Sequence, residues 1–281
     1  MNSRRNFLKA SGALAAGTIL LPNLAKAANR RSVKNVGLQL YTVRKEMLED
    51  NIGTLKKIAS LGYKEIESAG SEKGSYYGFE PAEMKKICTD LGMTLRSGHV
   101  HYDDQWQKTI DDAADSGQEY LIISVLPANG QTVDNYKRVA EIFNKAGEAS
   151  KKSNIILGYH NHDSEFEKDN GKVLYDVLLE NTNPYFVKME MDIGWVIVTG
   201  NDPLAYFAKY PGRFPLWHLK DMDLKEKHSV EFGKGGLDIK KMLENSNKAG
   251  MKYFFVEQEE YTGTAFECLE YNMKYLNNLK Y

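Results

Sequence analysis

The chain has 281 residues, 42% hydrophobic and 27% charged, which is enough for one large α/β domain. Its first 28 residues hold four basic side chains (Arg4, Arg5, Lys9 and Lys26) and no acidic one, so the remaining 33 of its 37 Lys and Arg face all 38 Asp and Glu. A net charge near −5 without blocks of Lys or Arg argues against nucleic acid or an anionic membrane as a partner.

Residues 1–28 have the features of a twin-arginine type export signal. Paired arginines in "SRRNFLK" precede a mildly apolar stretch, which ends in the small-x-small cleavage pattern of Ala25–Ala27. An uncleaved anchor is the alternative, but the stretch holds two glycines and a proline and is shorter than the roughly 20 apolar residues of a membrane span. We therefore expect residues 1–28 to be removed, a periplasmic location and no stable membrane association afterwards.

Eight β-rich segments then alternate with amphipathic helical segments. The expected strands are 36–42, 64–68, 94–100, 120–126, 155–160, 187–193, 215–221 and 252–258. Eight alternations predict a single (β/α)8 TIM barrel over residues 29–281. A doubly wound open sheet is the alternative, but "LQLYTVRKE" at the first strand lacks the glycine-rich phosphate loop of that fold. We expect Cys88 and Cys268 to be two buried thiols rather than a disulfide.

Polar side chains gather at the carboxyl ends of the expected strands, where TIM barrels place their chemistry. In chain order they are Gln39, Glu67, His99, His101, His160, His162, Asp192, His218, Lys220, Asp221 and Glu257. Each alone is equally explained as a hydrogen-bonded rim residue or a helix N-cap. Together, His160, Asp192, His218 and Glu257 close four successive strands, and two imidazoles with two carboxylates suit Mn²⁺, Zn²⁺, Co²⁺ or Fe²⁺ better than Mg²⁺.

At these residues the chain resembles the xylose isomerase-like TIM-barrel superfamily of sugar isomerases and epimerases, with inosose dehydratase relatives. The segments that carry the resemblance are "VGLQLYTVR", "GYKEIE", "YHNHDSEF", "MDIGW", "WHLKD", "GKGGLD" and "FFVEQE". The resemblance implies a metal site on His160, Asp192, His218 and Glu257, a small-molecule carbohydrate substrate and a possible homo-oligomer. Many epimerases of the group carry a glutamate at the position of His160 and use two carboxylate bases, from the fifth and the eighth strand. With a histidine at that position, the base of the fifth strand is lost or changed in this chain.

These observations predict a divalent-metal-dependent isomerase or epimerase that acts through an enediolate. Glu257 is the expected base, with Glu165 or His162 as further candidates, and Lys220 is expected to hold the developing oxyanion. A salt bridge to Asp221 is the structural alternative for Lys220. The expected substrate contacts are Glu67, His99, His162 and Trp195, with orientation of the metal ligands as the alternative for Glu67 and His99. Trp106 and Trp195 are equally explained as packing residues. Residues 231–238, rich in glycine, are expected to flank the mouth, with a phosphate cradle as the alternative.

Export favours a non-phosphorylated sugar or keto-sugar, because phosphorylated sugars are usually held in the cytoplasm. A metal-dependent carbon–oxygen lyase or dehydratase on keto-sugars or 3-keto-glycosides is the first alternative, favoured by His160. A non-catalytic periplasmic sugar-binding protein is less favoured, because binding alone needs no four-residue metal site. An endonuclease would need a basic face, which the acidic chain does not supply.

Overall fold

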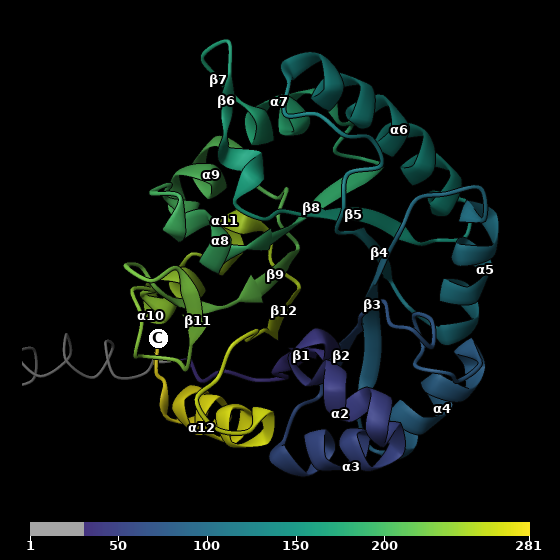
Figure 1. Cartoon of the computed structure of the whole chain (residues 1–281), viewed down its shortest axis with the longest axis vertical. Coiled ribbons are helices and arrows are strands. Elements are labelled where there is room, and N and C mark those ends of the chain that lie inside the picture. Colours follow the sequence, from purple (N-terminus) through teal and green to yellow (C-terminus); the bar gives the residue numbers. More distant parts are fainter. Residues whose placement is uncertain (1–30) are drawn as a thin grey trace, which may run out of the picture.

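The computed structural model describes residues 31–281 and contains a closed barrel of eight parallel strands surrounded by helices (Figure 1). The strands follow one another around the barrel in the order β1-β12-β9-β8-β5-β4-β3-β2, so successive barrel strands of the chain are neighbours. The predicted single (β/α)8 barrel is confirmed. The expected signal peptide, residues 1–28, lies outside the described residues.

All eight expected strands are present, several of them shorter than expected. The barrel strands are β1 (Gly37–Gln39), β2 (Glu65–Ser68), β3 (Thr94–Val100), β4 (Tyr120–Ile123), β5 (Ile156–His160), β8 (Val187–Asp192), β9 (Leu216–Leu219) and β12 (Tyr253–Val256). The longer helices are α3 (Asn51–Leu61), α4 (Pro81–Asp90), α5 (Trp106–Ser116), α6 (Val133–Lys151), α7 (Leu174–Asn181), α9 (Pro203–Lys209) and α12 (Ala265–Asn278). The short helical segments are η1 (Leu40–Val43), α2 (Arg44–Glu49), η2 (Ser164–Phe166), α8 (Ile193–Val198), α10 (Ile239–Glu244) and α11 (Ser246–Ala249). Two antiparallel hairpins complete the fold: β6 (Lys168–Asp169) with β7 (Lys172–Val173), and β10 (Asp221–Asp223) with β11 (His228–Val230).

The inside of the barrel is apolar at one level and polar at the next. Tyr120, Ile122, Leu216 and Phe255 form an apolar cluster separate from the main core. Gly158 on β5 belongs at this level, because a Cβ there would lie 2.5 Å from Ile122 Cδ1. Side chains alternate along a strand, so the residue two positions after Gly158 also points inward. The polar level therefore begins at the carboxyl ends of the strands.

The prediction that Cys88 and Cys268 are two buried thiols is confirmed. Cys88 and Cys268 are free and buried, and burial raises the pKa of each thiol to about 12. In the described part of the chain, every helix is too short or too polar to cross a membrane.

Candidate active site

Four side chains from neighbouring strand ends converge on one point inside the barrel. His160 closes β5, Asp192 closes β8, His218 lies on β9, and Glu257 follows β12. His218 Nδ1 lies 3.0 Å from both His160 Nε2 and Glu257 Oε2. Asp192 Oδ2 lies 3.5 Å from His160 Nε2 and 3.7 Å from His218 Nδ1. All four potential ligand atoms are within 4.8 Å of one another.

This arrangement fits a divalent transition-metal ion. Metal–ligand bonds of about 2.0–2.2 Å place neighbouring ligand atoms roughly 3–3.6 Å apart, which is close to the observed separations. Asp192 Oδ2 is buried and receives no aligned hydrogen bond from the described residues, although Lys220 Nζ lies 2.8 Å away. Burial and the neighbouring His218 lower the pKa of His160 well below its usual value, so His160 stays neutral, as a ligand must.

Asp192 is held from two sides. Its Oδ1 accepts a hydrogen bond of 2.9 Å from the backbone N–H of Trp195 and so caps α8, which leaves Oδ2 for the centre of the cluster. Asn161 fixes the backbone, because its Oδ1 accepts from Asp192 N at 3.2 Å and its Nδ2 donates to Asp192 O at 3.3 Å. The segment after His160 thus orients the neighbouring strand end.

Glu67 orients His218. His218 Nε2 lies 2.6 Å from Glu67 Oε1, which can accept its N–H, and the ring is thereby oriented with Nδ1 directed at the other three ligands. Glu67 has no exposed surface, and its carboxylate also accepts from Gln39 Nε2 at 2.7 Å and Ser97 Oγ at 2.5 Å. We therefore interpret Glu67 as a positioning residue for His218, which is the alternative to a substrate contact that the sequence left open.

Glu190 is a buried acid that the strand-end reasoning missed. It lies two positions before Asp192 on β8, and its Oε2 is 2.9 Å from His99 Nε2 and 3.4 Å from His218 Nε2. Burial and the adjacent Glu67 raise the pKa of Glu190 to about 7. Burial alone would lower the pKa of His99, but Glu67 and Glu190 raise it to about 9. His99, His160, Glu190 and His218 form a second potential ligand group that shares both imidazoles with the first.

Lys220 is buried under the acidic side of the cluster. Its Nζ lies 2.8 Å from Asp192 Oδ2, 2.6 Å from Glu257 Oε2 and 2.5 Å from Glu259 Oε1. Burial disfavours its charge, but these carboxylates outweigh burial and hold the pKa of Lys220 well above its usual value. Its ion pairs are thus made inside the site, and the alternative of a pair with Asp221 does not describe it.

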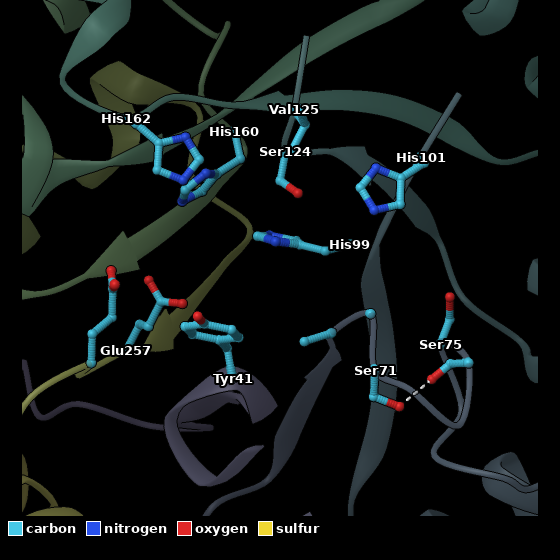
Figure 2. Close-up of a pocket in the computed structure, with 14 residues that line it drawn as sticks. Tyr41, Ser71, Ser75, His99, His101, Ser124, Val125, His160, His162 and Glu257 are labelled. Atoms are coloured by element: carbon cyan, nitrogen blue, oxygen red, sulfur yellow. Dashed lines mark hydrogen bonds between the residues drawn. The ribbon is translucent and has the colours of Figure 1, made fainter. Parts of the chain in front are cut away.

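A cavity of about 630 Å³ opens above the cluster. Its wall includes four histidines and two glutamates: His99, His101, His160, His162, Glu257 and Glu259 (Figure 2). Among the described residues that line it, the two glutamates supply the carboxylates, and none is a lysine or an arginine. The Trp195 ring lies 6.3 Å from the His162 ring and 5.2 Å from Lys220 Nζ, so this half-buried indole flanks the His162 side.

Two sequence-based candidates, Glu165 and Trp106, have other contacts. Glu165 accepts from Tyr159 Oη at 2.8 Å and from His162 N at 2.7 Å, so it fixes the loop after β5. Trp106 is buried on α5 and its Nε1 donates to Ala146 O, as in the packing alternative.

The Asp221 carboxylate accepts from the backbone N–H groups of Gly233, Gly235 and Leu237 at 2.9–3.1 Å. These N–H donors of the glycine-rich loop are therefore already bonded to Asp221, which argues against a phosphate cradle in this loop.

Comparison with known proteins agrees with the fold and with export. Residues 1–20 match the twin-arginine translocation signal sequence, so the protein is exported across the cytoplasmic membrane. The inosose dehydratase of Clostridium tetani is 32% identical over 91 residues, which are 32% of this chain and 30% of that protein. The chain spans about half or less of the length of the inosose dehydratases it matches.

Solved structures match over much more of the chain. A sugar phosphate isomerase/epimerase from Parabacteroides distasonis is 30% identical with a TM-score of 0.78, over 88% of this chain and 99% of that one. The IOLI protein with a bound zinc atom has a TM-score of 0.66 at 12% identity, over 86% and 96% of the chains, which shows the shared fold alone.

Residues 55–279 match the family described as xylose isomerase-like TIM barrel. The chain therefore belongs to the xylose isomerase-like TIM barrel family.

Proposed function

We propose that the protein is a divalent-metal-dependent isomerase or epimerase that acts through an enediolate on a non-phosphorylated sugar or keto-sugar. The observation that carries the proposal is the position of Glu257, which belongs to the candidate ligand group and also lines the cavity. His160, Asp192, His218 and Glu257 would hold the ion, which supplies Lewis-acid polarisation of a substrate carbonyl when bound.

Glu257 is the proposed base. Burial would raise the pKa of Glu257, but Lys220 and His218 outweigh burial and lower it well below its usual value, so the carboxylate is ionised. It takes the proton from the carbon next to the carbonyl, because the charge left behind is delocalised onto oxygen. Lys220 has 1% of its side chain exposed, so we assign it to holding the carboxylates of Asp192 and Glu257 in place rather than to touching the substrate.

A neutral substrate is supported by the charges of the cavity. Among the described residues that line the cavity, no lysine or arginine offers a permanent positive charge to a phosphate, and Asp221 already occupies N–H donors of the glycine-rich loop. Export of the chain supports the same assignment.

A metal-dependent carbon–oxygen lyase is the second candidate, and one observation favours it. His160 and His162 line the cavity at the end of β5 (Figure 2), and many epimerases of the group carry a glutamate at the position of His160. An imidazole suits protonation of a departing oxygen, whereas epimerisation needs a second group that returns the proton to the opposite face of the same carbon. The similarity to inosose dehydratases supports this candidate as well.

The two reactions are separated by incubating the metal-loaded protein with a panel of sugars, keto-sugars and 3-keto-glycosides in D₂O and recording NMR spectra. Deuterium in an isomeric product supports the first candidate, and an unsaturated product supports the second. Glu257→Gln should abolish either reaction while circular dichroism shows that the barrel is still folded. Turnover by this variant would remove Glu257 from the mechanism, and binding without any turnover by the parent protein would contradict both enzymatic candidates.

A further inference from the structure

We infer that the cavity accepts a substrate of two linked sugar rings, with the reacting ring beside Glu257 and the second ring toward the loops after β2 and β3. This inference rests on the proposed function for the place of the reacting ring. We call His160 and Glu257 the inner end, and Ser71, Ser75 and His101 the outer end. Both ends line one continuous cavity, and Figure 2 shows them on opposite sides of His99.

The size of the cavity exceeds the need of one ring. If each of the about twelve non-hydrogen atoms of a hexose took the ~30 Å³ that a water molecule takes in the liquid, one ring would fill roughly 360 Å³. The cavity measures about 630 Å³. A single ring at the inner end thus leaves the outer end unfilled. At Gly70 on the cavity wall, an added Cβ would meet nothing within 4 Å, which agrees with open space there.

The outer end offers neutral hydrogen-bonding groups. Ser71 is used by the loop, because its hydroxyl donates to Gly74 O over 2.7 Å and holds the turn. Ser75 and His101 present a hydroxyl and an imidazole to the cavity (Figure 2). Both groups can donate and accept, as sugar hydroxyls require, and neither is a fixed charge that would select an ionic ligand.

Apolar surface borders the passage between the two ends. Tyr41 and Val125 line the cavity, and they are 40% and 54% exposed although both are large hydrophobic residues. Figure 2 places them on opposite sides of the mouth. Apolar surface with a few polar groups is the usual lining of a small-molecule site, and the C–H faces of sugar rings suit such surface.

The test is a binding measurement that does not depend on turnover. Titration calorimetry of the purified protein would compare glucose with maltose, cellobiose and laminaribiose. We expect at least one disaccharide to bind about tenfold more tightly than glucose, because its second ring gains a few hydrogen bonds at the outer end. Saturation-transfer NMR should show contact with both rings.

Two variants test whether the second ring binds at the outer end of the cavity. His101→Ala should remove the outer imidazole and Ser75→Trp should block the outer end, and each should bring the disaccharide affinity down to that of glucose. His228→Ala is the matched control, because His228 lies on β11 and does not line the cavity. It should keep the disaccharide preference.

The outcomes separate this inference from the proposed function. If no disaccharide binds more tightly than glucose, or if the preference survives both His101→Ala and Ser75→Trp, the second-ring site is overturned even where sugars are turned over. If disaccharides bind with the expected preference but no substrate of the panel reacts, the site stands and the proposed function fails.

Discussion

Replacing Lys220 with methionine should destabilise the protein strongly. Methionine keeps a long unbranched side chain but removes the positive charge that lies within 2.8 Å of the carboxylates of Asp192, Glu257 and Glu259. Removing one partner of a buried ion pair costs about 3–5 kcal/mol, because the remaining charge stays buried and unpaired. At about 2–4 °C per kcal/mol for a domain of this size, the unfolding midpoint should fall by roughly 6–20 °C.

The assay is thermal unfolding followed by circular dichroism, with and without EDTA. The loss should be largest in EDTA, because a divalent ion compensates two of the same carboxylates when it is bound. Lys209→Met is the matched control: Lys209 pairs with Asp176 at 3.0 Å, but half of its side chain is exposed, so the change should cost no more than about 1 kcal/mol. Equal midpoints for the two variants would refute the assignment of Lys220 to charge compensation.

Three further predictions concern the metal and the loop. His218→Ala should lose the roughly one divalent ion per chain that elemental analysis of the purified protein is expected to find, and retention of that ion would contradict the ligand assignment. Metal affinity should rise between pH 6 and pH 8. Burial would lower the pKa of His218, but Glu257 and Glu190 raise it well above its usual value. At lower pH a proton therefore competes with the metal for His218 Nδ1. Zinc titrations that agree at both pH values would disprove this competition. Asp221→Ala should lower the free energy of unfolding by at least about 3 kcal/mol and accelerate amide exchange at Gly233, because several hydrogen bonds to a carboxylate are lost. Unchanged exchange would count against the assignment of Asp221 to holding the glycine-rich loop.

The barrel was predictable because its strands are short, β-rich and evenly spaced. The strand ends were less so. We expected the fourth strand to reach residue 126, but β4 ends at Ile123, and Ser124 and Val125 leave the sheet to line the cavity. A run of apolar residues cannot distinguish the last paired residue from the first loop residue, because both favour extended backbone.

The small hairpin of β6 and β7 carried a sequence signal that we did not use. Asn170 and Gly171 connect its strands, and both have positive φ, 50° and 78°. Asn-Gly is the preferred pair for such a two-residue turn. The β10–β11 hairpin lacks that signal, and of β10 (Asp221–Asp223) only Asp221 falls within the seventh predicted strand, 215–221.

The sequence identified the candidate ligands that lie one to a strand end. It did not identify Glu190, because two residues of the same strand belong to the site there. Glu190 and Asp192 occupy alternate positions of β8, so the period of two places both inside the barrel. Reading only the last position of each strand hides the first of them. Glu259 was missed for a related reason: it lies in the loop beyond Glu257, and its contact with Lys220 depends on how that loop turns.

The charges of the cluster give a further reason to expect a cation there. Glu67, Asp192 and Glu257 are buried carboxylates whose pKa values, despite burial, are lowered by neighbouring cationic groups, so all three are ionised. Lys220 supplies one permanent positive charge, and a divalent ion would supply the two that remain. Glu190 and His99 adjoin the same group: burial and Glu67 raise the pKa of Glu190 to about 7, and Glu67 and Glu190 raise that of His99 to about 9 against the effect of burial. Without the ion, a proton on His218 has to compensate in its place, so metal and proton are alternatives at one nitrogen. A buried group of this kind is stable only when one of the two is present. Because the pKa of His218 is raised in the folded protein, stability without the ion should fall as the pH rises toward 8, whereas metal loading should rise.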